Sequence, residues 1–158
     1  MTAPEILAQF PARSALVVGD ICLDRRCSYD PAASEPPRET GILRTAVVST
    51  EVTPGAGGTV ANNLAAQGVG RVAVLGVLGN DGFGYELRQA LAGRVIDSRL
   101  LVVVPGLQTF TYTKVINAET GVEDSRAWIS SVPGRSRRRS RRSWWSGSGR
   151  KPAPTTSS

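Results

Sequence analysis

The middle of the chain reads Gly55-Ala56-Gly57-Gly58-Thr59-Val60-Ala61-Asn62-Asn63, and this segment indicates a turn that opens a helix. Three glycines exceed what a plain strand-to-helix turn needs, and without Cβ atoms their backbone N–H groups can approach a ligand closely. Thr59 can cap a helix over residues 60–67, which Gly68 ends. The segment is neither a Walker A loop nor a dinucleotide fingerprint, since no Gly-Lys-Ser/Thr follows and the G-x-G-x-x-G spacing is missing.

Apolar runs on both sides of this turn predict the strands of an α/β fold. Residues 14–20 read as a buried strand with a continuously apolar centre, and residues 71–78 read as a second one. A helix is expected over 85–91, and further strands over 100–104 and 109–117. Strands that alternate with helices imply a layered α/β fold with a largely parallel sheet and helices on both faces.

The segment between the first strand and the glycine-rich turn is polar. Residues 25–41 contain Pro31, Pro36 and Pro37, which predicts loop or irregular edge structure. Residues 42–52 alternate imperfectly between apolar and polar side chains, which favours one or two exposed antiparallel strands.

The first predicted strand runs into Gly19-Asp20-Ile21-Cys22-Leu23-Asp24. A carboxylate at the C-terminal end of a strand lies on the edge where open α/β sheets bind ligands, so Asp24 can accept hydrogen bonds from a polyol. The alternative is a loop acid that pairs with Arg25 or Arg26. Cys22 and Cys27 fit no common zinc spacing and the chain has no His, so we expect two reduced thiols and no metal site.

In order and spacing, these features resemble the PfkB/ribokinase family of carbohydrate kinases, most closely its heptose-phosphate kinase branch, over residues 14–124. The resemblance rests on the two segments quoted above together with Gly79-Asn80-Asp81-Gly82-Phe83-Gly84, whose family counterpart has a mainly structural role. It implies a ribokinase-like three-layer α/β/α fold. Residues 25–53 would form a small β-lid that covers the sugar and often mediates dimer contacts, so a homodimer through the lid is one expectation.

The resemblance also implies which residues hold the substrate. Asp24 would bind sugar hydroxyls. Thr59 stands where the branch usually has Asn. The amide contact to the sugar is therefore expected from Asn62 or Asn63. The remaining substrate-binding candidates are Gly55, Gly57, Gly58, Asn62 and Asn63. Intact relatives of this type use ATP and Mg²⁺ to phosphorylate a hydroxyl of a sugar or sugar phosphate.

The family's second signature, Asp-Thr-x-Gly-Ala-Gly-Asp, is absent from the 158 residues. In the family this segment supplies the anion hole for the transferring phosphoryl group and the aspartate base for the sugar hydroxyl. Phosphoryl transfer depends on positioning and charge stabilisation, so a chain without these groups is expected to be inactive. We therefore expect a kinase domain truncated after its N-terminal half and assign no catalytic residue.

Charge divides the chain at one point. Residues 1–124 hold 10 Lys+Arg and 13 Asp+Glu, a net charge of −3, whereas residues 125–158 hold 9 Lys+Arg and no acid. The basic segment is rich in Ser, Arg, Pro and Gly and is expected to be disordered. Its Arg run, followed by Trp144 and Trp145, allows an alternative function: a non-catalytic protein that binds nucleic acid through this tail.

Translation in a displaced reading frame also explains the basic segment. In that case its positive charge says nothing about partners, and we do not expect the protein to bind nucleic acid. Residues 127–135 can be encoded by GCG TGG ATT TCA TCA GTA CCC GGC CG, which from its third base reads Val-Asp-Phe-Ile-Ser-Thr-Arg-Pro. That string resembles the continuation in heptose-kinase-like relatives, and in the same frame Arg codons CGG or AGG after a G become Ala or Glu. We therefore expect a single-base insertion or deletion near codons 124–126.

The N-terminus lacks a charged region followed by an apolar one, and no apolar run approaches the roughly 18 residues that span a bilayer. This pattern predicts a cytoplasmic protein with no membrane partner.

Overall fold

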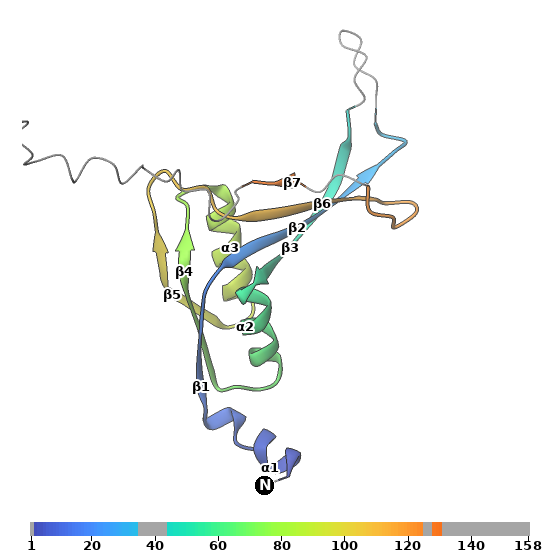
Figure 1. Ribbon diagram of the computed structural model, residues 1–158. Coiled ribbons are helices and arrows are strands. Elements are labelled where there is room, and N and C mark those ends of the chain that lie inside the picture. The colour runs from blue at the N-terminus through green and yellow to red at the C-terminus, as the bar shows by residue number, and fades with distance from the viewer. Residues whose placement is uncertain (1, 35–43, 125–127, 131–158) are drawn as a thin grey trace, which may run out of the picture.

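The computed structural model of the protein describes residues 2–34, 44–124 and 128–130. It contains two sheets, of three and four strands, with two longer helices beside them (Figure 1). In chain order the elements are α1 (Ala3–Leu7), the 3-10 turn η1 (Phe10–Ala12), β1 (Ser14–Val18), β2 (Ile21–Asp30), β3 (Ala46–Ala56), α2 (Gly57–Ala66), β4 (Arg71–Leu78), α3 (Gly82–Ala92), β5 (Ile96–Val103), β6 (Thr111–Asn117) and β7 (Trp128–Ile129).

The first sheet is parallel and has the order β1-β4-β5. Its three strands confirm the strands predicted around residues 14–20, 71–78 and 100–104. The two predicted helices are also confirmed. Both α2 and α3 start three residues earlier than predicted. Gly68 follows α2 with a φ of +86°, a conformation that favours glycine and ends the helix.

The expectation of helices on both faces of this sheet is wrong for the described residues. Both crossovers, β1 to β4 and β4 to β5, move in the same direction across the sheet, and right-handed crossovers of this kind place their helices on one face. The other face stays open: Leu16 and Val18 of β1 are 51% and 66% exposed, and Val77 and Val102 are also exposed. The apolar run in β1 therefore marks a strand, but not one buried on both sides.

The second sheet, which we call the mixed sheet, has the order β3-β2-β6-β7. Strand β2 pairs antiparallel with β3 and parallel with β6. The prediction of loop over 25–41 is therefore wrong for its first six residues, because β2 continues to Asp30 as an inner strand whose backbone groups are paired on both sides. The exposed antiparallel strand predicted over 42–52 is confirmed by β3 from Ala46 onward.

The chain crosses from one sheet to the other at Gly19 and Asp20. Gly19 has a φ of +149°, in the range that favours glycine, and its N–H donates to Leu75 O at 3.1 Å. The mixed sheet then projects away from the carboxyl ends of the parallel strands (Figure 1). The predicted β-lid, residues 25–53, corresponds to parts of β2 and β3 within this sheet.

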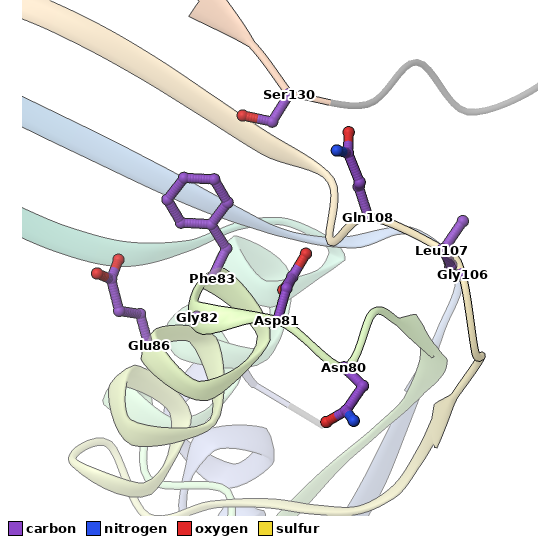
Figure 2. A pocket seen from close by; sticks show the side chains of 9 residues that line it. All are labelled: Asn80, Asp81, Gly82, Phe83, Glu86, Gly106, Leu107, Gln108 and Ser130. Atoms are coloured by element: carbon purple, nitrogen blue, oxygen red, sulfur yellow. The ribbon is translucent and has the colours of Figure 1, made fainter.

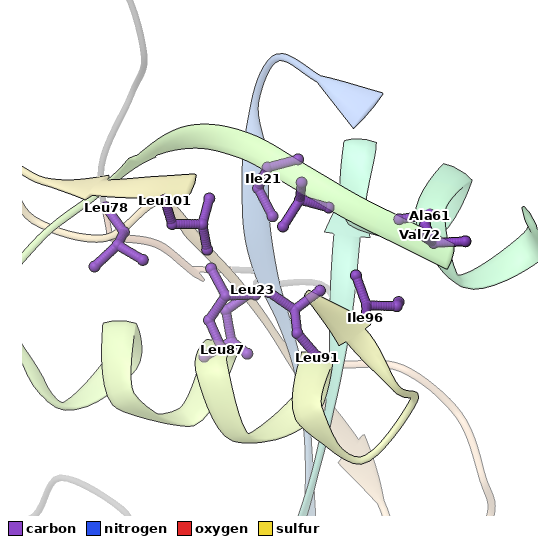
Figure 3. Close-up of a cluster of buried hydrophobic side chains, with 10 residues drawn as sticks. Ile21, Leu23, Ala61, Val72, Leu78, Leu87, Leu91, Ile96 and Leu101 are labelled. Carbon is purple, nitrogen blue, oxygen red and sulfur yellow. The ribbon is translucent and has the colours of Figure 1, made fainter. Parts of the chain in front are cut away.

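A single apolar core lies between the parallel sheet, the start of β2 and the two helices (Figure 3). Leu23, Leu87 and Leu91 are fully buried, so α3 packs its apolar stripe against both sheets. The other core residues are Ile21, Ala61, Val72, Val74, Leu78, Ile96 and Leu101.

Leu87→Ala is expected to lower the free energy of unfolding by about 3 kcal/mol, because it removes buried methyl groups and leaves a cavity at the centre of the core. Tyr85→Ala on the same helix is the matched control, since Tyr85 is 66% exposed and its loss should change stability by less than about 0.5 kcal/mol. Urea unfolding followed by circular dichroism compares the two. Equal losses would contradict the assignment of Leu87 to the core.

Of the basic segment 125–158, the structure describes only residues 128–130. Trp128 and Ile129 form β7, which pairs antiparallel with Thr113 and Tyr112 of β6, so the expectation of disorder is wrong for these two residues. The other expectations for this segment, its disorder elsewhere, its Arg run and its Trp pair, concern residues outside those described. No helix in the described ranges is long and apolar enough to cross a membrane.

Candidate functional site

Asp24 and Gly55 are brought together by the pairing of β2 with β3. Cys22 is the register partner of Gly55, and Asp24 is the partner of Thr53. A Cβ added to Gly55 would lie 2.5 Å from Asp24 Oδ1, so the carboxylate sits directly over the Gly55 backbone. Gly55 is buried and Asp24 half-buried. The glycine therefore provides the space that the Asp24 carboxylate occupies.

Cys22 lies beside the same carboxylate. Its Sγ donates to Asp24 Oδ1 at 3.9 Å, and the side chain is 4% exposed. Burial, together with the negative charge of Asp24, raises the pKa of the Cys22 thiol to about 11. The thiol is therefore neutral at physiological pH and acts as a weak donor, not as a nucleophile. Cys22 and Cys27 are both unpaired.

The other two glycines of the turn pack against the protein itself. A Cβ on Gly57 would lie 2.9 Å from Asp20 O, and one on Gly58 would lie 2.6 Å from Pro54 Cβ. The N–H of Gly57 already donates to Asp20 O at 2.9 Å. These two glycines thus permit close packing where β3 joins α2, and the Gly57 N–H is already bonded within the chain.

The asparagines and Thr59 lie on α2. Asn62 is half-buried and Asn63 exposed, and within the described ranges neither side chain forms a hydrogen bond to Asp24. Thr59 does not cap the helix as predicted: the N-cap residue is Ala56, with a φ of +49°, and Thr59 Oγ1 donates to Pro54 O at 3.2 Å. Of the predicted site residues, the structure therefore joins Asp24 to Gly55 but not to the asparagines.

Asp81 connects the start of α3 to the start of β6. Its Oδ1 accepts from Gly84 N at 2.8 Å and from Thr109 Oγ1 at 2.7 Å, and its Oδ2 accepts from Thr109 N at 2.8 Å. Thr109 is fully buried, and its hydroxyl also accepts from Gly79 N. The segment 79–84 thus has the structural role that the resemblance implied, whereas nothing in the sequence singled out Thr109.

A hollow of about 690 Å³ opens at this end of α3 (Figure 2). Asp81, Phe83 and Glu86 line it from the helix, and Gln108 and Ser130 from the opposite side. A second hollow, of about 850 Å³, is lined in part by Arg25, Cys27 and Thr113. Asp24 lines neither of them. Within the described residues, no group of three His, Cys, Asp or Glu side chains is placed to hold a metal ion.

Arg25 was a candidate partner of Asp24, but the structure pairs it with α3. Its Nε lies 2.9 Å from Glu86 Oε2, and its guanidinium lies 5.0 Å from the centre of the Phe83 ring. Because side chains alternate along a strand, Arg25 and Asp24 point to opposite faces of the mixed sheet. Arg25 is therefore excluded as the partner of Asp24. The other candidate, Arg26, lies on the same face as Asp24, but no ion pair joins the two among the described residues.

Comparison with known proteins places this architecture in a family. Residues 14–129 match the model of the pfkB family carbohydrate kinases. The chain belongs to the pfkB family. The expected resemblance is thereby confirmed, and the match covers both sheets and both longer helices.

Two curated relatives of this pfkB chain are bifunctional proteins HldE. The protein from Geobacter sulfurreducens is 35% identical over 111 residues, and the one from Nitrosococcus oceani is 33% identical over 111 residues. Each alignment covers 70% of this chain but only 22% and 23% of the relative. The chain thus spans less than a quarter of the length of these relatives.

Solved kinase structures share the fold. A carbohydrate kinase from Agrobacterium tumefaciens matches with a TM-score of 0.52 at 21% identity, over 74% of this chain and 35% of that one. The ribokinase from Cryptococcus neoformans var. grubii serotype A, in complex with ADP, matches with a TM-score of 0.50 at 16% identity, over 77% and 37% of the two chains. The pfkB chain therefore has a ribokinase-like α/β fold, matched over about a third of these kinases.

Proposed function

We propose that this chain carries the sugar-binding part of a kinase that transfers the γ-phosphoryl group of ATP to a hydroxyl of a sugar or sugar phosphate. The observation that carries the proposal is the Asp24 carboxylate, held over Gly55 near the start of β2, the strand that follows β1. An ionised carboxylate without a cationic partner among the described residues can accept two hydroxyl hydrogen bonds from a sugar. The mixed sheet would then cover the bound sugar as a lid.

The neighbours of Asp24 on the same face suit a phosphorylated sugar. Tyr112 is its register partner on β6, and its ring can pack against the apolar side of a sugar. Two residues further along, Arg26 and Lys114 are register partners, about 7 Å from the carboxylate along the strands. Lys114 also pairs with Glu123 at 3.0 Å, which orders its ammonium group on this face. Asp24 would bind the sugar hydroxyls, and Arg26 and Lys114 would bind the phosphate. The separation between the carboxylate and these two cations would match the length of a sugar phosphate.

We further propose that the 158 residues do not transfer phosphate by themselves. They lack the Asp-Thr-x-Gly-Ala-Gly-Asp signature, which supplies the anion hole and the base in the family. Within the described part of the chain, no group of three His, Cys, Asp or Glu side chains could hold a metal ion, so these residues do not fit Mg²⁺ with ATP. The displaced reading frame near codons 124–126 accounts for the loss of the signature.

A coupled ATPase assay tests this proposal, with the chain compared against a version in which the reading frame is restored. We expect sugar-dependent turnover from the restored protein and none from the 158-residue chain. Sequencing the DNA beyond codon 126 is the matching control, and it should reveal a Gly-Ala-Gly-Asp in the shifted frame. Turnover by the short chain, or early stop codons in the shifted frame, would contradict the proposal.

A further inference from the structure

Arg25 ties β2 to α3 at the residue next to Asp24. Its Nε lies 2.9 Å from Glu86 Oε2 and its Nη2 3.5 Å from Glu86 Oε1, while the guanidinium stacks over Phe83. The two charged side chains are only 21% and 34% exposed, so they are screened less than a surface pair. This contact joins residues 61 positions apart, one on β2 and one on α3.

The α3 end of this contact is itself fixed. Asp81 caps the helix through Gly84 N and accepts two hydrogen bonds from the buried Thr109 at the start of β6. The first turns of α3 are therefore attached to two neighbouring strands of the mixed sheet, to β6 through Asp81 and to β2 through Glu86. A strand held to a fixed helix at one side chain can neither slide nor rotate at that position.

Side chains alternate along β2, so holding Arg25 toward one face also fixes the direction of its neighbour on the other face. With the Arg25 side chain held toward α3, the preceding residue must project away from α3, and the Asp24 carboxylate then lies over Gly55. Phe83 supports the guanidinium from the helix and points toward the strands of the mixed sheet (Figure 2). Without the charge on Arg25, Glu86 would be left without a cation in a half-buried place, and β2 would lose its charged contact with α3 at this position.

We infer that Arg25 is a positioning residue for Asp24: by binding Glu86 and Phe83, it holds β2 so that the Asp24 carboxylate stays in place over Gly55. This role rests on the sugar-binding function proposed for Asp24. Arg25 itself does not touch the sugar, since its side chain lies on the other face of the mixed sheet.

Cys22 provides a reporter of this restraint that needs no sugar. Its thiol is buried beside Asp24, so a thiol reagent such as DTNB reaches it only when β2 opens locally. The Cys27→Ser background leaves Cys22 as the single thiol, and serine can accept the hydrogen bond that Thr50 Oγ1 donates to Cys27 Sγ. The rate of the DTNB reaction then measures the opening of β2 at Asp24.

In this background, Arg25→Met is expected to raise the Cys22 reaction rate on the order of tenfold, as the strand opens locally more often. The increase should persist unchanged in low urea, which distinguishes local opening from global unfolding. The charge exchange Arg25→Glu with Glu86→Arg should restore the slow rate, because it rebuilds the pair. Arg99→Met is the control, since Arg99 lies on β5 with its side chain 81% exposed, and its loss should leave the rate unchanged.

A Cys22 rate unaffected by Arg25→Met would overturn the inference, as would a charge exchange that folds but stays fast. If Arg25→Met does not fold, Glu86→Gln takes its place with the same expectation. Calorimetric titration with D-ribose, D-fructose and sedoheptulose 7-phosphate separates the two proposals. Absence of binding by the unsubstituted chain would contradict the sugar-binding function alone, and the Cys22 rate would still decide the role of Arg25.

Discussion

Asp81→Ala is expected to lower the free energy of unfolding by about 4 kcal/mol, a large part of the stability of a small domain. The substitution removes the cap of α3 at Gly84 N and leaves the N–H of Thr109 without an acceptor. Thr109 is 0% exposed, so water cannot replace the lost carboxylate. Only the Thr109 hydroxyl has a second acceptor, Gly79 O at 3.5 Å. Urea unfolding followed by circular dichroism measures the loss.

The same carboxylate should make the stability depend on pH. Burial alone would raise the pKa of Asp81, but the hydrogen bonds from Thr109 and Gly84 outweigh burial and hold the pKa below its usual 3.8. A carboxyl group with a lower pKa in the folded state stabilises the fold above its unfolded pKa, and this contribution is lost as the pH falls through the folded pKa. The difference in stability between the unsubstituted protein and Asp81→Ala should therefore be complete at pH 7 and shrink below about pH 4.

Asp97→Ala is the control for this experiment. Hydrogen bonds from Arg99 lower the pKa of Asp97 to about 2, but the pair lies at the surface, where the solvent screens it, and the unfolding midpoint should hardly change. Asp81→Asn, which keeps the shape of the side chain, should fall between the unsubstituted protein and Asp81→Ala. A midpoint of Asp81→Ala equal to that of Asp97→Ala would contradict the role assigned to the Asp81 network.

The sequence predicted the elements with clear hydrophobic periodicity. Strand β4 was predicted with its observed bounds, Arg71–Leu78, and α3 follows from the apolar spacing after Asp81. Strand β2 was not predicted: the predicted strand ended at residue 20, and residues 25–30 are mostly polar and lie next to Pro31, so they were predicted as loop. Its stability comes from partners on both sides, β3 and β6, and the β6 pairing joins segments about 90 residues apart, which local patterns do not reveal.

The residues of the candidate site could be predicted from the sequence, but the contacts between them could not. Asp24 and Gly55 were each singled out from the sequence, yet their contact depends on the register in which Cys22 faces Gly55. The pairing of Arg25 with Glu86 depends on the alternation of side chains along a strand that had been predicted as a loop. Once β2 is a strand, Asp24 and Arg25 must face opposite sides, and this excludes Arg25 as the partner of Asp24, one of the two arginines that the sequence had left open.

Gly55→Ala is expected to weaken sugar binding at least tenfold while the protein stays folded. The added Cβ would lie 2.5 Å from Asp24 Oδ1 and 2.6 Å from the Cγ and Oδ2 atoms. Only the end of a short side chain stands in the way, so the carboxylate can turn aside without moving the backbone. Displacing it costs the hydrogen bonds that it would make to the sugar, at about 1.5–3 kcal/mol for each bond to a charged group.

Alanine substitutions at the neighbouring glycines, Gly57 and Gly58, are expected to have a different outcome. A Cβ on Gly57 would meet the carbonyl oxygen of Asp20 at 2.9 Å, and one on Gly58 would meet the ring of Pro54 at 2.6 Å. Neither obstacle can turn aside, so Gly57→Ala and Gly58→Ala should lower the unfolding midpoint. Gly82→Ala is the neutral control, because nothing lies within 4 Å of its Cβ position and alanine favours the helix.

The decisive measurement is whether Gly55 acts through Asp24. The sugar that most raises the melting temperature of the unsubstituted protein is titrated by calorimetry into Gly55→Ala, Asp24→Asn and the double variant. If the alanine methyl group acts by displacing the carboxylate, the double variant should bind no more weakly than Asp24→Asn alone, because the displaced group has already been neutralised. Additive losses would mean that Gly55 contacts the sugar directly through its backbone, and unchanged affinity in Gly55→Ala would mean that the sugar does not bind at Asp24.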